Sequence, residues 1–285
     1  MATPFPIEQC IAENIAPSPG YRVFDGYKGR FPGPQWPGQA KLCVNIVLNY
    51  EEGGGGGGEY SVLNGDLHSE TDLQEMIGRP VRHGQRDIQR ETQYEYGTRV
   101  RVWRVAPDAA RFLVDSGHEI ASHGYCWINH HSCDPGPDRP AASGLALVCY
   151  VYSQQGLELL YQCDSYADEL PYWAPHPIMP DRGLLMISYT YDVNDNKFCT
   201  SPGFVNPRDW LNYCKAAFDV LYKEGCRGES KMMTIGLHSR LIGQPACCQA
   251  LRVLINYTQR LQDVWFATRK EIARHWIQVA CLEGG

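Results

Sequence analysis

Strand-like and helix-like segments alternate along most of this chain, and the alternation limits its fold more than any other feature. Residues 41–50 are apolar and β-branched almost without interruption, which is typical of a strand buried on both faces. The same patterns predict further strands at residues 118–124, 145–152, 184–190, 232–238 and 264–267, and helices at residues 100–104, 108–116, 207–222, 245–261 and 270–279. Strands that alternate with helices predict parallel βα units and an α/β fold.

Ionisable side chains follow three of these strands, at the end where each strand finishes. Glu51 and Glu52 follow the first strand, His123 ends the strand at 118–124, and His238 ends the strand at 232–238. In parallel α/β folds the carboxyl ends of the strands meet at one edge, and catalytic groups collect there. We therefore expect an active site at this edge.

Composition excludes several classes of protein. The 285 residues are 44% hydrophobic and 20% charged, so the chain can bury a core. Mean hydropathy is −0.37 and no apolar run approaches the ~18 residues of a membrane span, so no membrane segment is expected. A net charge of −6 argues against a nucleic-acid partner. The first residues lack the pattern of a secretory signal, which favours a cytoplasmic protein.

The cysteines fit the same compartment. The twelve cysteines are scattered, and none forms a C-x-x-C pair. Zinc-ribbon spacing is therefore absent, and we expect reduced thiols rather than a disulfide framework.

We expect the chain to consist of a short N-terminal arm and one large domain. Residues 1–40 form a Pro- and Gly-rich arm, and we expect Trp36 to anchor it. Residues 41–285 would form the catalytic domain. Six consecutive glycines follow Glu52 and predict a loop without phosphate-binding spacing. Residues 129–156 have no pattern that matches a regular element, apart from the apolar run noted above.

Seven longer segments resemble the NodB-homology (polysaccharide deacetylase) superfamily, most closely its PuuE-type allantoinase branch and related fungal proteins labelled chitin deacetylases. They lie in the family's order at residues 35–38, 47–53, 94–99, 117–125, 164–173, 236–243 and 271–276. The resemblance implies a distorted seven-stranded (β/α) barrel, a hydrolase of carbon–nitrogen bonds other than peptide bonds, and a possible homo-oligomer.

Two departures from the family pattern shape the expectations. Metal-dependent members carry two Asp after the first strand and His-x-x-x-His after the third. Here Glu51 and Glu52 take the first place, and Trp127 stands four residues after His123. The resemblance therefore implies the metal-independent branch without a cofactor, with zinc as the alternative. Fourteen residues between Trp103 and His118 leave no room for strand 2.

The resemblance also implies roles for the site residues. Glu51 would be the general base, with a pKa that burial raises toward neutrality. His238 would protonate the leaving nitrogen, and His123 would complete the site. A surface carboxylate and hydrogen-bonded core histidines are the structural alternatives. Residues that bind substrate would be Glu52, Trp127, Asp164, Asp168, Trp173 and Arg240.

Structural alternatives exist for several of these residues, because Asp164 and Asp168 could cap turns and Trp173 could pack in the core. Three functions stay open. The first is hydrolysis of a small cyclic, allantoin-like amide. The second is zinc-dependent deacetylation of an N-acetylated sugar polymer such as chitin. The third is a non-catalytic, truncated homologue.

Overall fold

The computed structural model describes residues 27, 33–51, 88–105, 118–121, 149, 152–153, 155–176, 179, 182–200 and 202–280. Its strands are β1 (Leu42–Asn49), β2 (Tyr172–Pro175), β3 (Gly183–Met186), β4 (Lys231–His238) and β5 (Val264–Phe266). Its longer helices are α3 (Ile88–Tyr96), α7 (Pro207–Cys226), α9 (Pro245–Thr258) and α10 (Arg269–Ala280). Short helical segments are η1 (Pro37–Gln39), η3 (Gly97–Arg101), α4 (Val102–Val105), η4 (Tyr191–Val193), η5 (Asp195–Phe198) and α8 (Ser239–Ile242).

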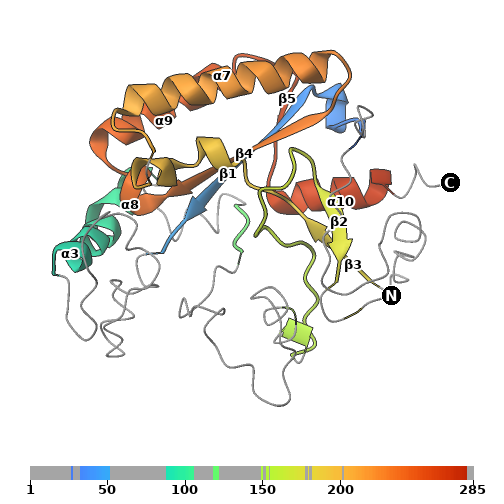
Figure 1. Ribbon diagram of the computed structural model, residues 1–285, viewed down its shortest axis with the longest axis horizontal. Helices are drawn as coiled ribbons and strands as arrows, with labels where there is room; N and C mark the ends of the chain where they lie inside the picture. Colours follow the sequence, from blue (N-terminus) through green and yellow to red (C-terminus); the bar gives the residue numbers. More distant parts are fainter. Residues whose placement is uncertain are drawn as a thin grey trace.

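A parallel sheet of three strands in the order β4-β1-β5 forms the centre of the described structure. The register of β1 and β4 runs from Leu42 beside Lys231 to Asn49 beside His238. Helices α7 and α9 lie over one face of this sheet (Figure 1). The two strands therefore end together, and the residues that follow them start from the same edge.

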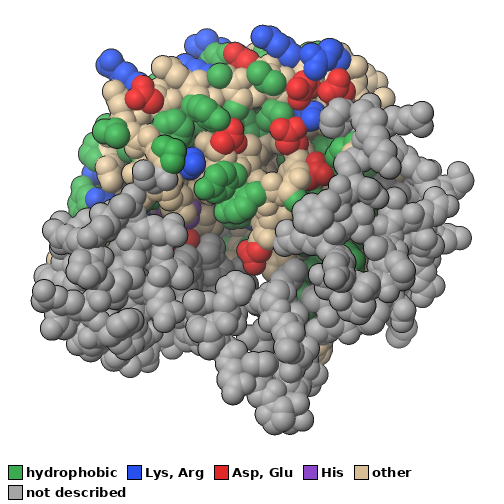
Figure 2. Space-filling model, viewed as in Figure 1, with side chains coloured by type: hydrophobic (Ala, Val, Ile, Leu, Met, Phe, Trp, Pro, Cys, Tyr) green, Lys and Arg blue, Asp and Glu red, His purple; other side chains and the backbone are tan. Residues whose placement is uncertain are grey.

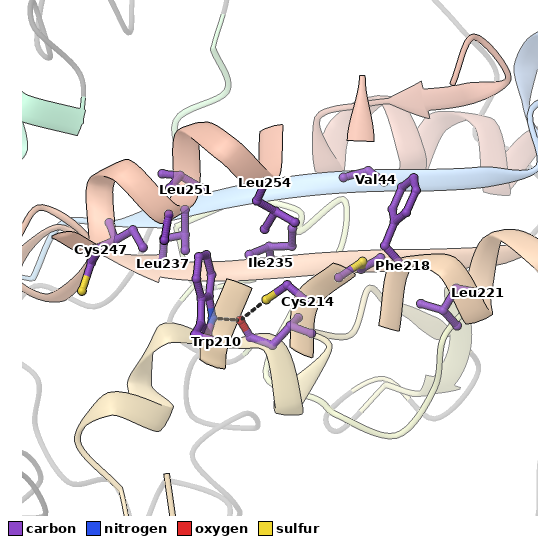
Figure 3. Close-up of a cluster of buried hydrophobic side chains, with 14 of the residues drawn as sticks. Val44, Trp210, Cys214, Phe218, Leu221, Ile235, Leu237, Cys247, Leu251 and Leu254 are labelled. Carbon is purple, nitrogen blue, oxygen red and sulfur yellow. Dashed lines mark hydrogen bonds between the residues drawn. The ribbon is translucent and has the colours of Figure 1, made fainter. Parts of the chain in front are cut away.

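Apolar side chains of alternate strand positions bury the face of the sheet beneath α7 and α9. Val44, Ile235 and Leu237 meet Trp210 and Phe218 of α7 in this cluster (Figure 3). The apolar positions of α7 recur at helical spacing and so form one stripe toward the sheet. This cluster holds β1 and β4 in the register that brings their carboxyl ends together.

Replacing Trp210 with Ala is expected to lower the free energy of unfolding by about 3–5 kcal/mol, because the substitution leaves a large cavity in the core. Trp210 is fully buried, and its Nε1 donates to the carbonyl oxygen of Val193 at 2.9 Å. The control is Val220→Ala on the same helix, where 54% of the side chain is exposed. It should change the free energy by no more than about 0.5 kcal/mol. Urea unfolding of both variants measures the difference, and equal losses would contradict this account of the core.

The opposite face of the sheet packs on a second cluster that includes the anchor expected in the arm. Trp36 is buried, and its Nε1 donates to the carbonyl oxygen of Lys231 at 2.9 Å. Its ring lies against Trp265, His275 and Trp276. Trp36 is thus buried as the predicted anchor would be, while residues 1–26 and 28–32 of the arm lie outside the described residues.

The sequence predicted the central elements well. The α/β class is confirmed, and β1, β4, β5, α7, α9 and α10 appear with ends that shift by a few residues. The distorted seven-stranded barrel stays a prediction. The predicted loss of strand 2 and the helix expected at 108–116 fall on residues 106–117, outside the described residues.

Two local predictions are wrong within the described residues, and a third is confirmed only in part. The strand predicted at 184–190 is present as the shorter β3, but it pairs antiparallel with β2, because seven intervening residues are too few for a parallel crossover. The described residues at 149 and 152–153 are helical rather than extended, since a short apolar run does not distinguish the two states. Residues 118–121 form no strand, and Glu119 there accepts hydrogen bonds from Tyr161 and from the backbone of Lys270.

The helix expected at 100–104 begins earlier, with α3 at Ile88, inside a stretch that the sequence analysis left without a predicted element. The apolar residues of α3 are too few to give a helical pattern in the sequence.

The described surface agrees with the composition. On the face shown in Figure 2, acidic and basic side chains are mixed along the edge formed by α7 and α9 and do not gather in one basic patch. Within the described residues, no helix combines the length and the apolar character that crossing a bilayer requires. Cys43, Cys214, Cys247 and Cys248 are buried free thiols, as predicted.

Candidate active site

Glu51 and His238 meet at the carboxyl end of the parallel sheet. Asn49 and His238 are register partners, and Glu51 follows Asn49 by two residues. Oε1 of Glu51 lies 3.3 Å from Nε2 of His238, and both side chains are about 95% buried. The prediction that these strand ends bring a carboxylate and an imidazole together is confirmed.

Asp195 holds the other side of the imidazole. It is fully buried at the start of η5, and its Oδ1 lies 2.6 Å from Nδ1 of His238. Its Oδ2 accepts the backbone N–H of His238 at 2.8 Å. With Nδ1 fixed in this way, Nε2 is turned toward Glu51. The close approach of this loop requires Gly236, because a Cβ there would lie 2.5 Å from Nδ2 of Asn194.

Arg240 holds the second oxygen of Glu51. Its Nη1 donates to Oε2 of Glu51, and only 4% of the arginine is exposed. The short helix α8 places it two residues after His238. Its guanidinium also lies 5.2 Å from the centre of the Tyr94 ring on α3.

The helical segment α3–η3–α4 supports this arginine. Arg101 donates to the carbonyl oxygen of Arg240, and Arg104 donates to that of Gly243. A side chain at Gly243 would clash with Arg101, so glycine permits the contact. The segment at 94–99 that carries part of the family resemblance therefore lies next to the site.

The charges of the site differ from the sequence-based expectation. Burial alone would raise the pKa of Glu51, but the hydrogen bonds and charges of His238 and Arg240 outweigh it and lower the pKa to about 2. The expectation of a raised pKa for Glu51 is therefore wrong. Burial alone would lower the pKa of His238, but Asp195 and Glu51 raise it to about 9. At neutral pH the pair is a carboxylate facing an imidazolium.

This ion pair predicts how stability depends on pH. The pKa of His238 rises from 6.5 to about 9 on folding. Its contribution to stability is therefore fully present below pH 6.5 and is lost as the pH rises through about 9. Unfolding free energy measured between pH 6.5 and 9.5 should fall in the wild type and fall less in His238→Gln. The control, His275→Gln, removes a half-buried imidazole at the arm, far from the ion pair, and should follow the wild type. Equal slopes in the wild type and His238→Gln would contradict the ion pair.

The structure places the other predicted residues away from this centre or does not describe them. His123, Glu52 and Trp127 lie outside the described residues. Asp164 is exposed, and its backbone N–H donates to the side chain of Gln162.

Asp168 and Trp173 belong to the other end of the sheet. Asp168 accepts the backbone N–H of Leu170, as in the turn-capping alternative, and the neighbouring Glu169 bonds the backbone of Met232 near the start of β4. Eight-residue β4 separates this end from His238 by ~20 Å. Trp173 packs on the cluster around Trp36.

Sequence reasoning missed Asp195 and the partner of Arg240. Arg240 was expected to hold substrate, whereas its guanidinium binds Glu51. Asp195 follows the predicted strand at 184–190, so the rule that selected the other strand ends could have found it. Among the described residues, no group of three or more His, Cys, Asp and Glu side chains is arranged to hold a metal ion.

Comparison with known proteins identifies the family to which the chain belongs. No family model matches the chain. A Schizosaccharomyces pombe protein, provisionally described as a polysaccharide deacetylase, is 34% identical to this chain. The match covers 85% of this chain and 92% of the relative. The chain belongs to the polysaccharide deacetylase (NodB-like) family. Proteins of this family, here including an allantoinase, hydrolyse carbon–nitrogen bonds, and the chain is an enzyme of that class.

Solved structures of the polysaccharide deacetylase family agree with the fold. A crystal structure from Pseudomonas aeruginosa PAO1, provisionally described as a polysaccharide deacetylase, is 38% identical with a TM-score of 0.76 and covers 90% of this chain and 98% of that one. The crystal structure of PuuE allantoinase is 38% identical with a TM-score of 0.75, over 90% of this chain and 96% of that chain. A Mycobacterium smegmatis structure at 18% identity and a TM-score of 0.55 shares the fold.

Proposed function

We propose that the chain hydrolyses the carbon–nitrogen bond of a small cyclic amide, as an allantoin-like substrate would present it. One observation carries the proposal: Glu51 and His238 face each other at 3.3 Å while Asp195 holds the far nitrogen of the imidazole. A base and an acid are thus aimed at the same point from two strand ends. The similarity to PuuE allantoinase supports a cyclic amide as the substrate class.

The reaction follows from the two charges. Glu51 takes a proton from a water molecule, and the water oxygen forms a bond to the carbonyl carbon. The C–N bond then breaks as Nε2 of His238 gives its proton to the departing nitrogen. Asp195 keeps the imidazole in the orientation that this transfer needs. Return of the Glu51 proton to His238 restores the resting pair.

Binding of substrate would also make Glu51 a stronger base, because it would raise the pKa of this side chain. In the absence of substrate, the hydrogen bond from His238 is the largest influence that lowers the pKa of Glu51. A substrate bound between the two groups displaces Nε2 of His238 from Glu51 and removes that hydrogen bond. The pKa of Glu51 then rises toward the range of an effective base. Binding thus couples activation of the base to the presence of the bond that is cleaved.

We propose further that no metal takes part. The two carboxylate oxygens of Glu51 face His238 and Arg240, and both of these groups are cationic. A divalent ion on this carboxylate would stand beside two positive charges in a buried site, which is unfavourable. The described residues around Glu51 therefore do not fit a zinc ion, and the reaction above needs none.

An N-acetylated sugar is the second candidate substrate. Tyr50 precedes Glu51, Tyr191 begins η4 just before Asp195, and both side chains are more than half exposed. Tyr166 packs edge-on against Tyr191 at 5.0 Å. Exposed aromatic rings beside a site can cover the apolar face of a sugar. The description of the Schizosaccharomyces pombe relative supports the same substrate class.

Turnover of three substrates by the purified chain separates these functions. Allantoin, succinimide and a chitooligosaccharide are incubated with the enzyme, and products are identified by mass spectrometry. The proposal predicts that a cyclic amide gains one water molecule through ring opening. Release of acetate from the oligosaccharide alone would favour the second candidate. Hydrolysis of none of the three would contradict both candidates.

A further inference from the structure

Arg269 is a buried cation that the hydrolytic mechanism does not use. It is the first residue of α10, and only 7% of it is exposed. Nε and Nη2 of its guanidinium are buried and, within the described part of the chain, have no hydrogen-bond partner. These two atoms form one edge of the guanidinium, the edge that donates two parallel hydrogen bonds to a planar oxygen acceptor.

Arginine keeps its charge when buried, so an unpaired donor edge is costly unless a partner binds it. The carboxylate of Glu119 reaches the residue after Arg269, and its oxygens accept hydrogen bonds from the Tyr161 hydroxyl and the backbone N–H of Lys270. Burial raises the pKa of the neighbouring Cys163 thiol to about 12, although the charge of Arg269 opposes the rise. The thiol is therefore neutral at pH 7 and supplies no negative charge. The side chains of Cys163 and Tyr189 also hydrogen-bond the guanidinium. Within the described residues its Nε and Nη2 nevertheless have no partner, so this donor edge is left for another group.

The position of Arg269 links it to the catalytic centre. Its guanidinium lies over the ring of Tyr189, 4.0 Å from the ring centre. The Tyr189 hydroxyl donates to Oδ1 of Asn49 at 3.3 Å, and Asn49 is the register partner of His238. The ring of Tyr189 therefore lies between Arg269 and Asn49, which precedes Glu51 by two residues.

The face of the sheet that leads to the catalytic centre carries further polar groups without partners. Asn45 and Thr234 are register partners on β1 and β4, two strand positions before the layer of Tyr189 and Gly236. Oδ1 of Asn45 and Oγ1 of Thr234 are buried and, among the described residues, unpartnered. They lie on the face opposite the cluster around Trp210, as does His238. The part of this face between the apolar cluster around Trp36 and the catalytic centre is thus polar as well as buried, which suits a polar ligand.

We propose that Arg269 binds substrate at the end remote from the scissile bond, by donating from Nε and Nη2 to a carboxylate or to a ring carbonyl oxygen. The inference rests on the proposed function for the location of the scissile bond. It adds the requirement that the substrate carry a second, planar oxygen acceptor. A cyclic ureide or imide has such a carbonyl, and so does an open-chain dicarboxylate.

Binding of two unreacted probes tests the assignment without any turnover. Hydantoin, a neutral ring with two carbonyl groups, and succinate, a dicarboxylate, are titrated calorimetrically into the full-length wild type and the Arg269→Gln variant. We expect the wild type to bind at least one probe and the variant to bind it at least tenfold more weakly. The probe that binds shows whether a carbonyl or a carboxylate is preferred. The control is Arg260→Gln, which removes an exposed arginine near Tyr257 and should bind like the wild type.

Thermal unfolding without ligand separates binding from a structural role. A binding arginine with an unpaired edge gives the empty protein little stability, so Arg269→Gln should melt at the wild-type temperature or above it. Equal probe affinity in the wild type and the variant, or no binding of either probe to the wild type, would overturn the assignment. A lower melting temperature together with weaker binding would also overturn it. If probe binding depends on Arg269 while no amide is hydrolysed, the proposed function fails and only the assignment of Arg269 as a ligand-binding residue stands.

Discussion

Replacing Glu51 with Gln is expected to lower kcat for amide hydrolysis by about 10⁴-fold, the upper end of the range for a general base. Gln keeps the shape of the side chain and can still accept from Arg240, but it cannot take a proton from water. Initial rates with the substrate that the wild type turns over best measure the effect. The loss should appear in kcat rather than in KM, because the carboxylate acts in the transition state.

Glu169→Gln is the matched control for this substitution. Glu169 pairs with Lys231 at the start of β4, at the other end of the sheet, and about half of its side chain is exposed. This variant should keep the wild-type kcat. If Glu51→Gln retained more than about a tenth of the wild-type rate, Glu51 would not be the base.

The Asp195→Asn substitution is expected to lower kcat by about 10³-fold. Asp195 accepts from both the backbone N–H and Nδ1 of His238, and a single amide oxygen cannot accept both hydrogen bonds in the same way. An amide N–H that faced Nδ1 would favour the wrong tautomer and disfavour the imidazolium, as in hydrolytic triads. The pKa of His238, measured by NMR titration, should therefore fall below its value of about 9.

Asp192→Asn tests whether the effect is specific to Asp195. Asp192 lies three residues earlier in η4 and accepts from the Tyr213 hydroxyl at the surface. The substitution should leave kcat and the pKa of His238 unchanged. A wild-type rate in Asp195→Asn, or an equal loss in both variants, would remove Asp195 from the mechanism.

The central fold could be predicted because its signals are local. The continuous apolar runs of β1 and β4 are typical of strands covered on both faces, and Asn206 with Pro207 marks the start of α7. The structure shows Asn206 capping the backbone N–H of Arg208, as such a start requires. The pairing of β2 with β3 could not be read in this way, because β2 is only four residues long, partly buried and ends in proline, so its sequence shows no strand pattern.

Part of the candidate site could be predicted from the sequence for the same reason. Glu51 and His238 stand at strand ends, where a rule about parallel sheets finds them. The state of Glu51 could not be predicted, because its pKa depends on His238 and Arg240, which lie almost 190 residues further along the chain. Burial by itself predicted a raised pKa, and only the positions of these two cations reverse the direction. Arg269 gave no signal at all, since an arginine at a helix start is ordinary in sequence.

The most direct test of the central claim is the hydrolysis rate of a cyclic amide after exhaustive treatment of the enzyme with a chelator. The claim is that Glu51 and His238 cleave the C–N bond as base and acid without a metal. It predicts that the chelated wild type retains its full rate and that Glu51→Gln is about 10⁴-fold slower under both conditions. Loss of activity on chelation, with recovery on addition of zinc, would contradict it.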